Sequence, residues 1–284
     1  MAFTDGYWWS NDGLRLHYRD YSGDMARLPV ICLHGLTRNA RDFAALAERL
    51  IPARRVICPE FRGRGESAYA KDALSYVPLT YVQDIDRLLG ELCIDRFIAI
   101  GTSLGGIVTM LLAAAEGGRV AGAVINDVGP TIEEAGLARI RGYVGRSPSW
   151  PTWVHAARAI AETNADVYPD YRLPDWIAMA KRLYRLTSAG RIVGDHDTRI
   201  AEPFRLPGGE TGVDLWPALA ALRAVPTLLV RGERSDILSE SGLADMRARL
   251  PDAETVTVPR VGHAPTLDEA EAVAAIDRLL ARLP

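Results

Sequence analysis

A serine lies between two glycines in the stretch Gly101-Thr102-Ser103-Leu104-Gly105, within the longest uncharged part of the chain. Residues 97–100 form a short run of bulky apolar side chains, as in a buried strand, and apolar residues recur at helical spacing after the glycines. On a tight turn between strand and helix, a serine projects its hydroxyl from the carboxyl edge of the sheet. This pattern predicts that Ser103 is a nucleophile; a structural glycine-rich turn is the alternative.

A serine hydroxyl is a weak nucleophile unless a base takes its proton. Among five histidines, His263 lies in "RVGHAPTLDE", between a late strand and the last helix, so we expect it at the same edge of the sheet. The alternative for His263 is a solvated loop residue. The "GDHDTR" stretch, with Asp195, His196 and Asp197, could suggest a metal site. We interpret it as a polar surface loop and expect no metal, because no further ligands accompany it at suitable spacing.

The base needs a carboxylate that holds its tautomer and stabilises the imidazolium. Asp236 follows the apolar run of residues 227–230 and is the predicted acid. Asp127, which follows the strand after the serine turn, is the alternative. The order Ser103, Asp236, His263 along the chain is the one expected of this architecture.

A developing oxyanion needs backbone N–H donors. Leu104, directly after the nucleophile, supplies one, and Leu36 in the loop "HGLTRN" is predicted to supply the other. His34 and Gly35 would shape that loop and place His34 at the substrate pocket. The alternative for these two residues is a plain turn at the end of a strand.

Strand and helix patterns alternate along most of the chain, which predicts a mostly parallel sheet with helices on both faces. Helices are expected over residues 79–92 and 267–283, and Asn39 is a candidate cap for a further helix. Between residues 131 and 215 the strand-like runs vanish and helical patches appear. We therefore predict an α/β core of residues 1–130 and 216–284, interrupted by a helical cap of residues 131–215.

Tryptophans at positions 150, 153 and 176 lie in this cap. They either anchor the helices onto the core or line an apolar pocket above Ser103. Trp150, Trp153 and Trp176 are therefore the candidate pocket residues of the cap.

Composition is that of an ordinary soluble globule: 284 residues, 48% hydrophobic, 24% charged, formal net charge −3. The basic residues are scattered, so neither nucleic acid nor an anionic membrane is an expected partner, and nothing indicates an oligomer. The N-terminus lacks the pattern of a secretory signal, which favours a cytoplasmic protein. The three cysteines, at positions 32, 58 and 93, are expected to be reduced core thiols.

The chain resembles the serine α/β-hydrolase family in a series of motifs: "HGLTRNARDF", "PEFRGRGES", "GTSLGG", "RGERSDIL" and "VGHAP". The resemblance implies the α/β-hydrolase fold, an eight-stranded, mostly parallel sheet flanked by helices, with a helical cap. In "PEFRGRGES" the family often has Asp in place of Glu60 and His in place of Arg64. Arg62 and Arg64 are expected to be solvated loop charges, and contact with a substrate carboxylate is the alternative.

A serine at position 103 argues against dehalogenases and epoxide hydrolases, which use an aspartate there. The short loop "HGLTRN" is similar to that of enol-lactonases, carboxylesterases and cofactor-free perhydrolases. The resemblance thus implies a hydrolase without a cofactor that cleaves a small ester, thioester or lactone through an acyl-enzyme. Two alternatives are a carbon–carbon bond hydrolase of ring-fission products and a ligand-binding member of the fold without turnover.

Overall fold

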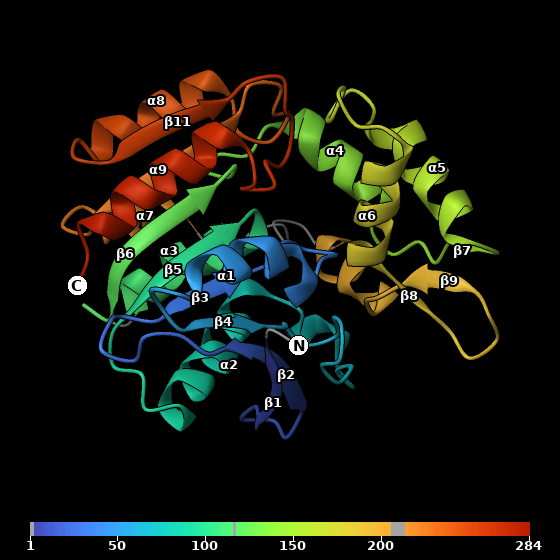
Figure 1. Ribbon diagram of the computed structural model, residues 1–284, viewed down its shortest axis with the longest axis horizontal. Coiled ribbons are helices and arrows are strands. Elements are labelled where there is room, and N and C mark those ends of the chain that lie inside the picture. The colour runs from blue at the N-terminus through green and yellow to red at the C-terminus, as the bar shows by residue number, and fades with distance from the viewer. Residues whose placement is uncertain (1–2, 116–117, 206–213) are drawn as a thin grey trace.

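The computed structural model describes residues 3–115, 118–205 and 214–284 (Figure 1). Its main sheet has eight strands in the order β1-β2-β4-β3-β5-β6-β10-β11. Strand β2 pairs antiparallel with β1 and with β4, and all other neighbours are parallel. The strands are β1 (Thr4–Trp9), β2 (Arg15–Tyr21), β3 (Val30–Leu33), β4 (Val56–Pro59), β5 (Phe97–Thr102), β6 (Val120–Asn126), β10 (Thr227–Gly232) and β11 (Glu254–Val258). The predicted α/β-hydrolase sheet is confirmed.

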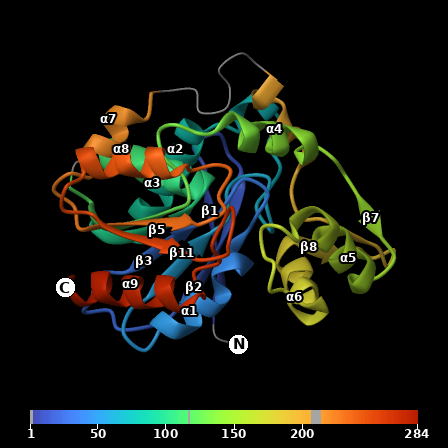
Figure 2. The same cartoon turned by 90° about the horizontal axis from the view of Figure 1, so that it is seen from above.

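The sheet is covered on both faces, as the continuous apolar runs of its central strands require. Helices α1 (Ala44–Leu50) and α9 (Ala270–Ala281) pack on one face. On the other face lie α2 (Pro78–Glu91), α3 (Leu104–Ala115), α7 (Trp216–Ala220) and α8 (Glu240–Arg249), and Figure 2 shows both layers. The two predicted helices correspond to α2 and α9.

The Asn39 side chain caps the turn that leads into α1. Its Oδ1 accepts a hydrogen bond from the Arg41 N–H at 3.0 Å, at the start of the 3-10 turn η1 (Ala40–Phe43). A short polar side chain at this position satisfies a backbone donor that the helix itself cannot pair. The cap that the sequence suggests is therefore present.

Between β6 and α7 the chain leaves the main sheet and forms a separate group of elements, which Figures 1 and 2 show to one side of the core. It contains the helices α4 (Glu134–Tyr143), α5 (Trp153–Asn164) and α6 (Leu173–Leu183), the strands β7 (Ser149–Trp150), β8 (Tyr184–Leu186) and β9 (Ile192–Gly194), and the 3-10 turns η3 (Thr198–Ala201) and η4 (Pro203–Arg205). The expectation that strands vanish here is wrong. The strands pair antiparallel in the order β7-β9-β8, but at two or three residues they are too short to show an alternating pattern.

This group is tied to the core at the edge where the serine turn lies. The Gly262 N–H donates to the Val167 carbonyl at 2.9 Å, and the Tyr168 hydroxyl donates to the Ala264 carbonyl at 2.7 Å. Both contacts reach the loop that carries His263. Among the described residues, no helix has both the length and the apolar character needed to cross a bilayer.

Candidate active site

Ser103 lies on the turn between β5 and α3, with a backbone φ of 53°, a left-handed conformation that is strained for a residue other than glycine. The flanking glycines are needed for steric reasons. A Cβ on Gly105 would lie 1.9 Å from the Leu33 carbonyl oxygen, and one on Gly101 would lie 2.2 Å from the Gly105 oxygen. The close packing of β5, the turn and α3 thus explains the spacing of the motif.

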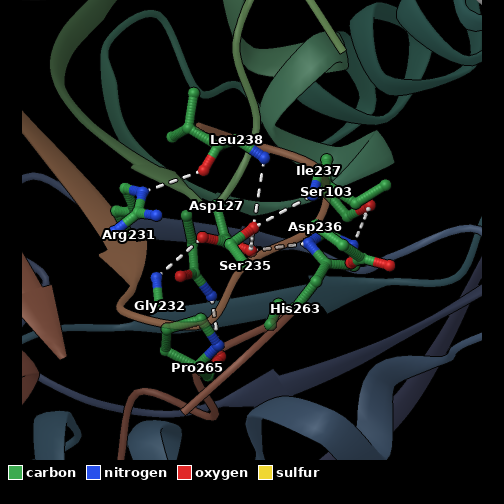
Figure 3. Close-up of polar contacts among 12 residues, drawn as sticks. Ser103, Asp127, Arg231, Gly232, Ser235, Asp236, Ile237, Leu238, His263 and Pro265 are labelled. Atoms are coloured by element: carbon green, nitrogen blue, oxygen red, sulfur yellow. Dashed lines mark hydrogen bonds and ion pairs between the residues drawn. The ribbon is translucent and has the colours of Figure 1, made fainter. Parts of the chain in front are cut away.

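Ser103 and His263 are in direct contact. The Ser103 hydroxyl donates to His263 Nε2 at 3.0 Å, and His263 Nδ1 lies 2.7 Å from Asp127 Oδ2. An ionised carboxylate only accepts hydrogen bonds, so Nδ1 carries the proton and Nε2 is free to accept one. The three side chains come from three loops at one edge of the sheet, after β5, β6 and β11 (Figure 3).

The carboxylate beside His263 is therefore that of Asp127, and the expectation that Asp236 would hold the imidazole is corrected. Asp127 directly follows β6 and is fully buried. Its Oδ1 accepts from the Gly232 N–H and its Oδ2 from the Ser235 hydroxyl, both at 2.7 Å. With His263, three donors compensate the buried charge.

Asp236 instead forms a two-point ion pair with Arg139 of α4. Arg139 Nε and Nη2 lie 2.5 and 2.8 Å from the two carboxylate oxygens (Asp236 is also drawn in Figure 3). Partial burial acts to raise the pKa of the Asp236 carboxyl, but the hydrogen bonds from Arg139 outweigh it and the pKa lies below its usual value. Asp236 thus joins the inserted group to the core.

Two backbone N–H groups belong to residues beside Ser103: Leu36 in the loop after β3 and Leu104 at the start of α3. Leu36, Ser103 and Leu104 line the same cavity, and neither leucine N–H has a partner among the described residues. His34 lies beneath this loop: Nδ1 donates to the Gly35 carbonyl at 2.8 Å, and Nε2 accepts from the Phe61 N–H at 3.1 Å. Burial lowers the pKa of His34 to about 4, so the ring is neutral at pH 7, as these two hydrogen bonds require.

The cavity at Ser103 is small, about 40 Å³, and its walls are apolar apart from the serine. It is lined by Leu36, Ser103, Leu104, Ile107, Val128, Ile132, Leu137, Ile140, Phe204 and Ile237. These described lining residues include neither His34 nor any of the three candidate tryptophans. Trp150, Trp153 and Trp176 pack together within the inserted group instead, as anchors of its own small core.

Several residues expected at the surface are buried. Arg62 and Arg64 are 2% and 0% exposed, so the expectation of solvated charges is wrong for both. Asp195 and Asp197 are also buried and form ion pairs with Arg41 and Arg199, respectively, in place of a polar surface loop. In the opposite sense, Cys93 is exposed and is not a core thiol.

Glu60, at the position where the family often has aspartate, ties two loops together. It accepts hydrogen bonds from His17 Nδ1 at 2.9 Å, from the Ala40 N–H at 3.1 Å and from the Glu66 N–H at 2.7 Å. Burial acts to raise the pKa of this carboxyl, but the hydrogen bond from His17 and the further donors outweigh it and lower the pKa. The longer glutamate thus stabilises the loop after β4 from within.

Comparison with known proteins agrees with this architecture. The model of the alpha/beta hydrolase family matches residues 30–276, and the chain belongs to that family. The 3-hydroxybutyrate-oligomer hydrolase of Cupriavidus necator is 33% identical over 261 residues, which cover 89% of this chain and 88% of that protein. A pimeloyl-[acyl-carrier protein] methyl ester esterase of Xanthomonas campestris is 25% identical and covers 90% and 96%.

Among solved structures, an alpha/beta hydrolase from Novosphingobium aromaticivorans is 57% identical, with a TM-score of 0.96 over 99% of each chain. The names of these relatives describe hydrolases, including an esterase. The chain is therefore a member of a family of hydrolases.

Sequence reasoning singled out Ser103 and His263, which the structure brings into contact, and it weighed Asp127 as the alternative to Asp236. It missed Ser235, although this serine is next to Asp236 in "RGERSDIL". It also missed the apolar wall from α4 and η4, including Ile140 and Phe204. Helical periodicity marks these residues as buried but does not indicate what they pack against.

Proposed function

We propose that this protein is a serine hydrolase that cleaves a small ester, thioester or lactone through an acyl-enzyme. Ser103 is the nucleophile, His263 is the general base and then the general acid, and Asp127 orients the imidazole. The observation that carries the proposal is the hydrogen-bonded series from Ser103 Oγ to His263 Nε2, at 3.0 Å, and from His263 Nδ1 to Asp127 Oδ2, at 2.7 Å.

In the first half-reaction, Ser103 Oγ attacks the substrate carbonyl carbon while His263 Nε2 takes the hydroxyl proton. The carbonyl oxygen becomes an oxyanion, for which the Leu36 and Leu104 N–H groups are the proposed donors. The α3 N-terminus adds a favourable field. Collapse of the tetrahedral intermediate expels the alcohol or thiol, which receives the proton from His263.

In the second half-reaction, water attacks the acyl-enzyme and His263 takes a proton from it. The imidazolium that forms in each half is stabilised by the Asp127 carboxylate. When this second tetrahedral intermediate collapses, the bond from the acyl carbon to Ser103 Oγ breaks and Oγ takes the proton from His263, which leaves a carboxylic acid and free Ser103. No cofactor enters this scheme.

A short acyl group fits the site best. The cavity beside Ser103 is apolar and has room for only a few carbon atoms. Relatives named as a 3-hydroxybutyrate-oligomer hydrolase and a methyl ester esterase are compatible with ester substrates whose reacting part is small. We therefore expect p-nitrophenyl acetate and butyrate to be better substrates than the octanoate.

The proposal is tested with Ser103→Ala, which removes the nucleophile without adding volume. We expect kcat for p-nitrophenyl acetate to fall by about 10⁴-fold or more, with an unchanged melting temperature. A fluorophosphonate probe should label the wild type and leave the variant unlabelled. Turnover that survives the substitution would refute the nucleophile, and a folded wild type that neither reacts with the probe nor turns over ester would favour a binding protein.

A further inference from the structure

Arg64 is a fully buried arginine that contacts the loop of the proposed oxyanion donors. Its Nε donates to the Leu36 carbonyl at 2.9 Å, and its Nη1 donates to the Arg62 carbonyl at 2.8 Å and to the Tyr81 hydroxyl at 2.9 Å. Its Nη2 is buried and has no hydrogen-bond partner among the residues that the structure describes. The guanidinium carbon also lies 5.1 Å from the centre of the Tyr81 ring.

The acceptors around Arg64 are all neutral. Within the part of the chain that the structure describes, no carboxylate forms an ion pair with Arg64, although a buried guanidinium is costly without one. Arg62, two residues earlier, is equally buried but pairs with Asp12 and Asp84. The two arginines of the motif thus differ in their partners: Arg62 belongs to an ion-pair cluster, and the hydrogen bonds of Arg64 go to neutral oxygens.

Arg54 is another informative comparison, because it is also buried and, among the described residues, pairs with no Asp or Glu side chain. Its two terminal nitrogens donate to four carbonyls, those of Leu28, Leu280, Leu283 and Pro284. Leu280 lies in the last turn of α9 and Leu283 and Pro284 follow directly after it, at the end where the helix dipole is negative and favours a cation. The two carbonyls that Arg64 contacts, those of Leu36 and Arg62, do not lie at the C-terminus of a helix.

The Leu36 N–H is held between two anchored carbonyls. The amide is planar and trans, so its N–H points opposite the Gly35 carbonyl, which accepts from His34 Nδ1. On the other side, the Leu36 carbonyl accepts from Arg64 Nε. With both carbonyls fixed, the direction of the N–H between them is fixed as well.

We propose that Arg64 is a positioning residue for the oxyanion: it fixes the Leu36 amide and supplies a buried positive charge behind it. This inference rests on the proposed function. A positive charge at this depth is screened little and attracts negative charge that develops at the serine edge of the sheet. The positive field also reaches the neighbouring groups, since Arg64 adds to the burial that lowers the pKa of both His34 and His196.

The test compares two variants. Arg64→Met removes both the charge and the guanidinium N–H donors, and Arg64→Lys keeps the charge. Activity is expressed per active site titrated with the fluorophosphonate probe, so that misfolded protein does not count. For Arg64→Met we expect kcat for p-nitrophenyl acetate to fall by about 10- to 100-fold, less than for loss of a direct oxyanion donor, with KM within about twofold. Arg64→Lys should recover a substantial part of that loss.

A boronic acid inhibitor supplies a second readout, because its tetrahedral adduct with Ser103 carries the negative charge of the intermediate. Its affinity should weaken in Arg64→Met by the same factor as kcat/KM. Arg54→Met is the control: it also removes a buried arginine that has no Asp or Glu partner, at a site away from Ser103, and is expected to lower the melting temperature while kcat per titrated site stays unchanged.

The inference is overturned if Arg64→Met, or Arg64→Lys should the former not fold, keeps the wild-type kcat and inhibitor affinity per titrated site. A loss confined to KM would also overturn it. Failure of the proposed function is distinguishable, because it would appear without any change at Arg64. Either Ser103→Ala would keep its turnover, or the wild type would neither turn over ester nor react with the probe.

Discussion

Two neighbouring loops at the carboxyl edge of the sheet each carry an aspartate, and the two aspartates have different surroundings. In the loop after β6, Asp127 directly follows the last strand residue, is fully buried and contacts His263. In the loop after β10, Asp236 lies four residues past the strand, and 32% of its side chain is exposed. The first aspartate belongs to the site, and the second belongs to the contact with the inserted group.

The difference shows that proximity to the edge does not decide which carboxylate serves a histidine. The loop after β10 supports Asp127 with two donors, the Gly232 N–H and the Ser235 hydroxyl. The loop after β10, which was expected to supply the carboxylate for His263, thus holds the carboxylate of the neighbouring loop in place. Asp236 contacts α4 instead, where Arg139 donates a hydrogen bond to each of its two carboxylate oxygens.

The largest effect expected from this comparison is that of Asp127→Asn. An amide cannot stabilise the imidazolium and can favour the wrong tautomer of His263, so kcat for p-nitrophenyl acetate should fall by about 10³- to 10⁴-fold. The measurement is steady-state kinetics per active site, with circular dichroism to verify the fold.

Asp236→Asn is the matched control, because it makes the same chemical change in the adjacent loop. We expect kcat within about threefold of the wild type, since the hydrogen bond to His263 is untouched. If the two variants ranked the other way, Asp236 would regain the role of acid and the comparison of the loops would be broken.

A smaller effect is expected for Ser235→Ala. This removes the hydroxyl that donates to Asp127 Oδ2, the oxygen that His263 also contacts, and the acceptor for the N–H groups of Ile237 and Leu238. A hydrogen bond to a charged group contributes about 1.5–3 kcal/mol, so we expect kcat to fall by about tenfold or somewhat more. Ser241→Ala, on the exposed side of α8, serves as the control with unchanged kcat; equal activity of both variants would show that the second loop does not support the first.

Much of the fold was predictable, because local patterns report it directly. Apolar runs identify strands buried on both faces, and the alternation with amphipathic helices identifies the layers. The glycines around Ser103 identify the turn because a side chain at either position would collide with backbone. The two- and three-residue strands β7, β8 and β9 were not predictable, because their pairing is tertiary and their length carries no pattern.

The candidate site was predictable only where one residue and its loop suffice. Ser103 and His263 each belong to a local motif, and the structure brings their side chains into contact. The choice between Asp127 and Asp236 depends on how two loops fold against each other. Asp236 forms an ion pair with Arg139, a residue 97 positions away in sequence, and does not contact His263. Burial of Arg64 was equally hidden, because its neighbours His196 and Tyr81 come from distant segments.

The smallest effect concerns the Arg139–Asp236 pair itself, which we expect to contribute to stability alone. A double-mutant cycle with Arg139→Met and Asp236→Asn should give a coupling free energy of unfolding of about 0.5–1 kcal/mol at pH 7, as for other partly exposed ion pairs. The pKa of Asp236 is depressed in the folded protein, so this stabilisation is present above the usual carboxyl value of about 4 and is lost as the pH falls further. Urea unfolding at pH 7 and pH 3 checks both points. A coupling above about 3 kcal/mol, or one that persists in acid, would mean that Asp236 is as tightly integrated as Asp127 and that the two loops differ less than their contacts indicate.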